Sequence, residues 1–233
     1  DAVRIPRKEI ESFDSLLKTY TKGLGVRFAI CGSYRRGNGN SGDIDVLLSG
    51  SYDGFKETIK TLYEKDVLVD AFSDGKFKWM GMGRVPRYKL HRRVDLMYIT
   101  HEEYPFALLY FTGSKEFNVS IRGHALSRGY TLNEHGMKNT TTGKHVQGIK
   151  DEKGIFEFLD FPYTKPTNRN PGMYEIPQAK QHRHASLPIG FEGCCRFNVA
   201  KGVLLANTYD ETTDPAGYYV SEKFDGIRAI WNG

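Results

Sequence analysis

Hydrophobic and polar residues follow regular patterns along the first third of the chain. In residues 9–24, Ile10, Phe13 and Leu17 recur at helical spacing, and the glycines that follow supply a stop signal. A continuous apolar run and an alternating run come next, as expected for two strands. The pattern predicts a helix over 9–24, strands over 26–31 and 43–48, and a helix over 52–65.

The middle of the chain alternates polar and apolar residues in three further stretches, which suits an antiparallel or mixed sheet. Strands are predicted over 67–72, 77–83 and 94–99, helical structure over 104–129 with a break at 112–114, and short strands within 130–145. The sequence therefore predicts a mixed sheet with helices, followed by a smaller lobe of helices and strands.

Residues 162–188 have a different composition, rich in Pro, Asn, Gln, Arg and His with little periodicity. They contain five of the nine prolines, which predicts an extended, semi-rigid linker and a second unit that begins near residue 190. The chain starts at Asp1 and stops at Gly233 directly after an amphipathic run. We expect both ends to be cuts through a longer protein.

Composition narrows the class of protein. The net charge of +5 and the pI of about 8.9 suit an anionic partner, without proving that it is nucleic acid. Three cysteines form no disulfide framework, which fits a reducing compartment, and no stretch approaches the ~20 apolar residues of a membrane span. We expect a soluble, intracellular protein.

Histidines and cysteines near the linker are potential zinc ligands. The adjacent cysteines and the His-x-His pair lack the usual spacing of zinc ligands, so a solvated linker is the better interpretation of His182, His184, Cys194 and Cys195.

Two carboxylates stand on alternate positions of a predicted strand. Asp43 and Asp45 should project together while Ile44 and Val46 face the core. Such a pair repels unless a cation lies between its members, and hard oxygen ligands favour Mg²⁺ or Mn²⁺. A neighbouring strand that brought Asp95 alongside would complete a three-carboxylate site for two ions.

Simpler interpretations exist for the same residues. Asp43 could cap a turn, and Asp95 could pair with Arg93 two residues earlier. Gly32-Ser33 with two following arginines has the backbone N–H groups, hydroxyl and guanidinium groups that hold a triphosphate, although a glycine-rich segment is often only a turn. The position of this segment thirteen residues before Asp45 favours the functional interpretation.

Several motifs in order resemble family X DNA polymerases, the group that contains DNA polymerase β. Residues 32–37 and 42–46 resemble the palm signature, and 93–95 resembles the strand of the third carboxylate. Residues 109–114, with Phe117, Asn118 and Arg122, are similar to the nucleotide-binding thumb. The resemblance extends from Arg4 to about Pro166.

The resemblance implies an α+β fold, with a nucleotidyltransferase-type palm built on a mixed or antiparallel sheet and a small α/β thumb. The implied boundaries are a palm over 1–103, a thumb over 104–166, a linker over 167–190 and a further domain over 191–233.

The resemblance also implies roles for single residues. Asp43 and Asp45 would ligate two Mg²⁺ ions, and Asp95 would ligate the catalytic one and help to deprotonate the primer 3′-hydroxyl. The implied nucleotide contacts are Gly32, Ser33, Arg36 and Gly42 at the triphosphate, Tyr110, Phe111 and Gly113 at the sugar, and Asn118 at the base. The implied DNA contacts are Lys78, Arg93 and Arg122.

Some positions have structural alternatives or depart from the family. Tyr110 and Phe111 could belong to the core of a helix, and Asn118 and Arg122 could be solvated surface residues. Lys115 stands where relatives often carry an acidic residue, which leaves the contact with the base open. The family's N-terminal lyase and helix-hairpin-helix segments are absent from this sequence.

A second motif lies near the end of the chain. The spacing of Lys223, Asp225, Gly226 and Arg228 resembles the K-x-D-G-x-R signature of ATP-dependent DNA ligases, although such a string can be an exposed turn. The resemblance implies that Lys223 attacks the α-phosphate of ATP, with Glu222 and Arg228 at the nucleotide. The later motifs of the ligase domain are missing, so we expect no ligation by this chain.

These features lead to one main hypothesis. A template-directed DNA polymerase that fills short gaps would act as a monomer on gapped or primed DNA and deoxynucleoside triphosphates, joined to a ligase that seals the nick. It would work in the nucleus of a cellular eukaryote, and otherwise in the cytoplasm or at a viral replication site. A template-independent nucleotidyltransferase has the same Gly-Ser and Asp-x-Asp signature. A non-catalytic module that binds DNA ends and recruits a ligase is the third possibility.

Overall fold

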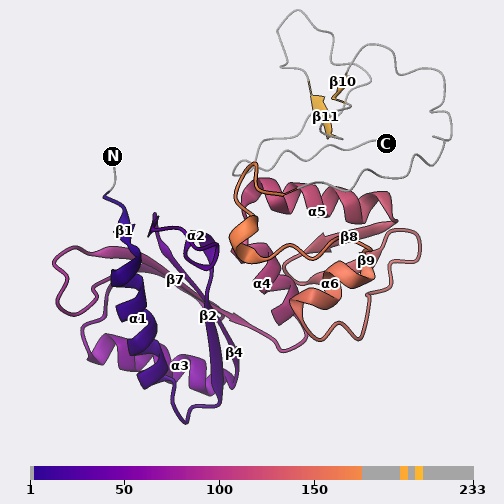
Figure 1. Ribbon diagram of the computed structural model, residues 1–233. Helices are drawn as coiled ribbons and strands as arrows, with labels where there is room; N and C mark the ends of the chain where they lie inside the picture. The colour runs from indigo at the N-terminus through magenta and orange to yellow at the C-terminus, as the bar shows by residue number, and fades with distance from the viewer. Residues whose placement is uncertain (1–2, 175–194, 199–202, 207–233) are drawn as a thin grey trace, which may run out of the picture. The chain divides into compact units, whose positions relative to one another are not determined.

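The computed structural model describes residues 3–174, 195–198 and 203–206 (Figure 1). The chain divides into two compact units, residues 1–179 and 180–233. In the second unit, β10 (Cys195–Asn198) and β11 (Val203–Ala206) form an antiparallel pair. The expected ligase residues Glu222, Lys223 and Arg228 lie outside the described residues, as do His182, His184 and Cys194.

The first unit contains a five-stranded mixed sheet, which confirms the predicted α+β fold class. The strands are ordered β2-β4-β7-β6-β5, and only β4 and β7 are parallel. Their bounds are β2 Val26–Ile30, β4 Ile44–Gly50, β5 Leu68–Asp74, β6 Lys78–Gly83 and β7 Arg92–Ile99. We call residues 5–99 the sheet region.

The two faces of β4 are buried against different helices because successive side chains point to opposite sides of a strand. Ile44, Val46 and Leu48 belong to the main core, which α1 (Arg7–Tyr20) and α3 (Tyr52–Glu64) cover. Leu47 belongs to a second cluster with Met97 and Ala107, the latter in α4 (Tyr104–Thr112). Asp45 has the same parity as Leu47 and so points to the α4 side.

Short elements hold the N-terminal segment and the Gly-Ser segment in place. Strand β1 (Ile5–Pro6) pairs with β3 (Asn40–Ser41), and α2 (Gly32–Arg35) lies between β2 and β3 in sequence. In the first unit, Arg92 Nε and Nη2 donate to the buried carboxylate of Glu9 at 2.9 and 2.8 Å, which anchors the start of β7 to α1.

Residues 104–170 form a smaller body that we call the helical lobe. It contains α4, α5 (Lys115–Ser127), the hairpin of β8 (Tyr130–Asn133) and β9 (Gly136–Asn139), α6 (Glu152–Phe158) and the 3₁₀ turn η1 (Pro166–Asn168). Phe117, Ile155 and Phe156 are fully buried in its core. The sequence indicated the hairpin strands but did not predict α6.

The predicted break between α4 and α5 has a local cause. Gly113 ends α4 with a φ of 68°, a conformation that glycine adopts without steric cost. The Ser114 hydroxyl then accepts a hydrogen bond from the Phe117 N–H and caps α5. None of the helices in the described part of the chain is long and apolar enough to cross a membrane.

Candidate active site

The parallel pairing of β4 and β7 brings two acidic residues from distant parts of the chain together. Asp45 and Asp95 are register partners, so their side chains share the face of the sheet that α4 covers. Their neighbours Ile44, Val46, Val94 and Leu96 are fully buried on the opposite face. The alternation of each strand therefore fixes both carboxylates at one edge of the helical lobe.

Asp43 lies in the bend directly before β4 rather than within the strand, and it is half-buried. Its charge still acts on Asp45. Burial raises the pKa of the Asp45 carboxyl to about 7, and the negative charges of Asp43 and Asp95 act in the same direction, whereas Arg93 and Lys78 oppose them. The three carboxylates thus form one electrostatically coupled group.

Asp95 has a cationic partner. Arg93 Nη2 donates to Asp95 Oδ2 at 3.1 Å, and Asp95 is itself buried. This is the ion pair that the sequence offered as an alternative to a metal site. Among residues that the structure describes, no group of three or more His, Cys, Asp or Glu side chains is already arranged around a metal position.

The donor chemistry nevertheless suits a hard divalent cation. Mg²⁺ and Mn²⁺ bind carboxylate oxygens, and a cation relieves the repulsion that raises the pKa of Asp45. Asp43 and Asp45 have the required oxygens, and so does Asp95, because a carboxylate that accepts from Arg93 keeps further lone pairs.

The Gly-Ser segment packs directly against these carboxylates. Gly32 has a φ of 57°, and a Cβ atom there would lie 2.9 Å from Asp45 Oδ2. The Cys31 N–H donates to the Asp45 carbonyl at 2.8 Å, and Ser33 Oγ donates to Ser41 Oγ at 2.8 Å. Only glycine at position 32 lets the backbone approach Asp45 so closely.

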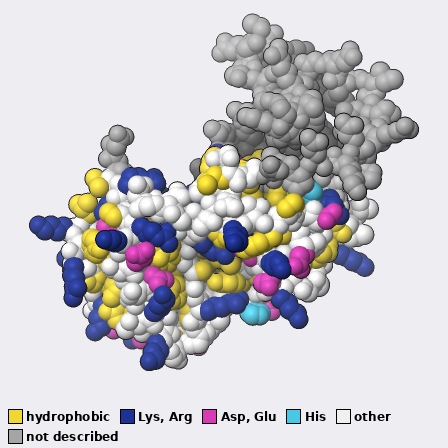
Figure 2. Space-filling model, viewed as in Figure 1, with side chains coloured by type: hydrophobic (Ala, Val, Ile, Leu, Met, Phe, Trp, Pro, Cys, Tyr) yellow, Lys and Arg dark blue, Asp and Glu magenta, His cyan; other side chains and the backbone are white. Residues whose placement is uncertain are grey.

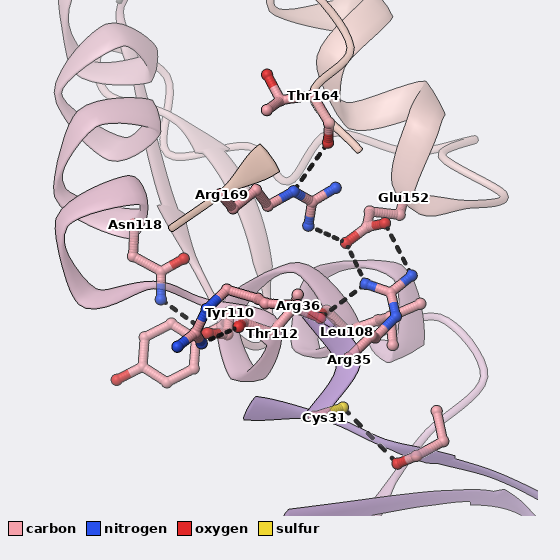
Figure 3. A network of polar contacts seen from close by, with 11 residues as sticks. Cys31, Arg35, Arg36, Leu108, Tyr110, Thr112, Asn118, Glu152, Thr164 and Arg169 are labelled. Carbon is pink, nitrogen blue, oxygen red and sulfur yellow. Dashed lines mark hydrogen bonds and ion pairs between the residues drawn. The ribbon is translucent and has the colours of Figure 1, made fainter. Parts of the chain in front are cut away.

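The two arginines of this segment reach the helical lobe (Figure 3). Arg35 donates from Nη1 and Nη2 to the two oxygens of Glu152 at 3.0 and 3.1 Å, and from Nη1 to Thr112 Oγ1 at 2.7 Å. Arg36 donates from Nη1 to the Thr112 carbonyl at 2.7 Å and from Nε to Asn170 Oδ1 at 2.8 Å. The segment therefore joins the carboxylates to the helical lobe.

Glu152 is the centre of this network, and it receives a second arginine. Arg169, which is fully buried, donates from Nη1 to Glu152 Oε1 at 2.6 Å and from Nε to the Thr164 carbonyl at 2.9 Å. Burial alone would raise the pKa of the Glu152 carboxyl, but the hydrogen bonds from Arg169 and Arg35 hold it below its usual value.

The expected nucleotide residues of the helical lobe gather around α4 and α5. Asn118 Nδ2 donates to the Tyr110 carbonyl at 2.7 Å, and the Arg122 guanidinium lies 5.7 Å from the centre of the Tyr110 ring. A small hollow is lined by these three side chains together with apolar residues. Phe111 is half-buried against the cluster of Leu47, as the structural alternative expected.

Two other expected contacts are accessible. Gly42 and Lys78 are exposed, and Lys78 precedes the buried Trp79 in β6. Gly113 is buried, and a Cβ atom there would lie 3.1 Å from Arg36 Nη1. Close approach to Arg36, besides the backbone turn, thus requires glycine at position 113.

Sequence analysis missed Thr112, Glu152, Arg169 and Asn170 as parts of the site. For Glu152 a signal existed, because Asp151 caps α6 by accepting from the Gly154 N–H at 2.8 Å, and an Asp before a helical stretch marks a helix start. The pairing of Arg35 and Arg36 with these residues had no local signal, since the partners lie 76 to 134 residues away.

Comparison with known proteins agrees with this architecture. The family model described as DNA polymerase beta palm matches residues 4–101, and the one described as DNA polymerase beta thumb matches residues 107–170. The chain belongs to the family X DNA polymerases.

Individual relatives point to the same family. The chain is 31% identical over 190 residues to DNA polymerase lambda of Rattus norvegicus, and 30% identical over 193 residues to DNA polymerase lambda of Arabidopsis thaliana. Each alignment covers 72% of this chain but only 33% and 36% of the relatives. DNA polymerase/3'-5' exonuclease PolX of Bacillus subtilis is 25% identical over 147 residues, which is 63% of this chain and 25% of that protein. The chain thus spans about a third or less of each relative's length.

Proposed function

We propose that this protein is a template-directed DNA polymerase that adds deoxynucleotides to a primer 3′-hydroxyl and fills short gaps during DNA repair. The observation that carries the proposal is the register of β4 and β7, which sets Asp45 opposite Asp95 with Asp43 just before the strand. Membership in family X supports the same activity.

In this proposal Asp43 and Asp45 would hold two Mg²⁺ ions, or Mn²⁺, and Asp95 would hold the catalytic one. Bound ions of this kind stabilise the attacking and leaving oxygens of an in-line displacement. Asp95 helps to take the proton of the 3′-hydroxyl. The carboxylate of Asp95 keeps further lone pairs for a cation while it accepts from Arg93, and the exposed side of the Arg93 guanidinium would contact a DNA phosphate.

The Gly-Ser segment is proposed to bind the triphosphate of the incoming nucleotide. Ser33 offers a hydroxyl, while Gly32 and Gly42 let the backbone approach the phosphates. Arg36 uses Nε and Nη1 to hold Asn170 and Thr112, which sets the plane of its guanidinium and leaves Nη2 for a phosphate oxygen.

The helical lobe is proposed to select the sugar and the base. Tyr110, Phe111 and Gly113 would contact the sugar, and Asn118 would bond the minor-groove edge of the base. The bond from Asn118 to the Tyr110 carbonyl holds that amide beside the sugar contacts. Arg122 would bind the template strand, and Lys78 would bind a DNA phosphate from β6.

Primer extension on gapped DNA tests the proposal. With Mg²⁺ and all four deoxynucleotides, we expect templated filling by the wild-type protein and a loss of at least ~100-fold in Asp45→Asn, because each metal ligand contributes several kcal/mol to the transition state. Asp53→Asn, at an exposed position in the first turn of α3, removes the same charge and should retain activity.

The outcome also separates the alternatives. Equal extension without a template would identify a template-independent nucleotidyltransferase. DNA binding without incorporation by the wild-type protein, or incorporation that Asp45→Asn leaves unchanged, would favour a non-catalytic module that binds DNA ends.

For residues 191–233 we propose the beginning of an ATP-dependent ligase adenylation domain, on the motif from Glu222 to Arg228. A longer protein that contains this chain should form a covalent adenylate on Lys223 when given ATP, visible as a mass increase. Lys223→Ala should abolish the adduct, and an adduct that persists in this variant would contradict the assignment.

A further inference from the structure

A hollow lined by basic residues lies at the end of β4 opposite the carboxylates. It is a shallow, open depression of about 530 Å³ where α1 ends, β2 begins and β4 ends. Its lining includes Lys18, Lys22, Arg27 and His101 but no Asp or Glu. Figure 2 shows Lys and Arg side chains along the lower edge of the sheet region, the end at which α1 meets β2 in Figure 1. Such a lining attracts anions.

A buried hydroxyl in this lining lacks a partner. Ser49 is fully buried, and its Oγ makes no hydrogen bond with the described residues. An unsatisfied buried polar group costs ~1–3 kcal/mol, so its presence at the end of this strand calls for a reason. Ser49 is the register partner of Arg27 on β2, which places the hydroxyl and the guanidinium on one face of the sheet.

Two uncharged contacts fix the position of the Arg27 guanidinium and leave its positive charge uncompensated. Its guanidinium lies 3.8 Å from the centre of the Tyr104 ring, and Nη2 lies 3.3 Å from His101 Nδ1. Neither Arg27 nor Lys22 has a carboxylate within ion-pair distance among the described residues, whereas Lys18 is already paired with Asp14 at 2.5 Å. The uncompensated positive charge of the hollow therefore comes from Arg27 and Lys22.

The turn between α1 and β2 closes one side of the hollow. Gly23 and Gly25 adopt φ values of 80° and 66°, and the Gly25 carbonyl accepts from the Ser51 N–H at 2.9 Å. These contacts fix the turn against the end of β4, while the space beside Gly23 is open. The hollow is therefore open to solvent beside Gly23.

We propose that this hollow is a second phosphate-binding site, separate from the candidate active site. A phosphate oxygen would accept from Arg27 and from Ser49 Oγ, and Lys22 would balance its charge. The phosphate group belongs either to a small free anion such as pyrophosphate or to the backbone of a DNA strand that extends past the sheet region. Both sources present the same tetrahedral anion to the same three side chains.

Binding without metal ions tests this proposal independently of polymerase activity. Pyrophosphate is titrated into the protein by calorimetry in a chelating buffer, and a single-stranded oligonucleotide is titrated over a range of salt concentrations. The variants are Lys22→Gln/Arg27→Gln and Ser49→Ala. The control is Lys56→Gln/Lys60→Gln, which removes two exposed charges from α3 and matches the charge change.

If the site takes a free anion, pyrophosphate affinity should fall at least tenfold in Lys22→Gln/Arg27→Gln and severalfold in Ser49→Ala, but not in the control. If it takes a DNA phosphate, the slope of log affinity against log salt should fall by up to ~2 in the double variant relative to the control. Ser49→Ala should unfold at the same or a higher urea concentration than wild type, because it removes an unsatisfied hydroxyl. Binding of both probes that equals the control in all variants would overturn the proposal.

Discussion

Arg35 and Glu152 form a two-pronged ion pair although 117 residues separate them in the chain, with N–O distances of 3.0 and 3.1 Å. Arg169 adds a third bond to the same carboxylate. Arg35 lies within the proposed triphosphate-binding segment, and Glu152 begins α6 of the helical lobe. The pair therefore links the phosphate-binding segment to the lobe that is proposed to hold the base.

Glu152→Gln should destabilise the protein by ~3–5 kcal/mol, because it leaves the guanidinium groups of Arg35 and Arg169 without their anion. Urea unfolding at neutral pH measures the change. Lys153→Gln removes an exposed ion pair with Glu157 on the same helix and should cost less than ~1 kcal/mol. Equal effects of the two substitutions would show that the buried network contributes no more than a surface pair.

The same carboxylate predicts a dependence of stability on pH. The pKa of Glu152 is lower in the folded state than its ordinary value of 4.5, so its contribution is fully present above that value and is lost as the pH falls through the folded value. The stability difference between wild type and Glu152→Gln should be constant near neutral pH and shrink in acid. A difference that grows on acidification would contradict the lowered pKa.

Gly32→Ala should damage both stability and catalysis. Alanine pays ~1–2 kcal/mol for the left-handed conformation, and its Cβ would lie 2.9 Å from Asp45 Oδ2, which must then move. Gly143→Ala has a similar φ of 66° but open space around it, so it isolates the backbone cost. In gap filling, only Gly32→Ala should slow incorporation more than tenfold; equal rates for both variants would exclude a displacement of Asp45.

Cys31 should be inert towards thiol reagents in the folded protein. Burial raises the pKa of its thiol from 9.0 to about 12, against a smaller opposing effect of Arg35, so almost no thiolate exists near neutral pH. A variant with Cys194→Ser and Cys195→Ser reports on Cys31 alone. Its reaction with a disulfide reagent should be slow in buffer and fast in concentrated urea, and fast reaction in buffer would argue against the burial.

Features that depend on residues close together in the sequence could be predicted from it. The alternation of Asp43 to Val46 predicted that Ile44 and Val46 enter the core, and the Gly113 break predicted two helices in place of one. The parallel pairing that sets Asp95 beside Asp45 was expected only as one possibility. The partners of Arg35 could not be predicted, because ion pairs between distant segments depend on how the helical lobe docks and leave no periodic signal.

Successive side chains of β4 pack into two different buried clusters, one on each face of the sheet. The number of residues in this strand is therefore constrained as well as their identity. Deleting or inserting one codon between Ile44 and Leu48 would turn Asp45 towards the main core, or move the apolar residues of that core to the face that α4 covers. Selection should therefore act against insertions and deletions in this strand as strongly as against substitutions of Asp45. The surface turn between β8 and β9 pairs with no strand, so its length is not fixed by a strand register. It can gain or lose residues far more freely.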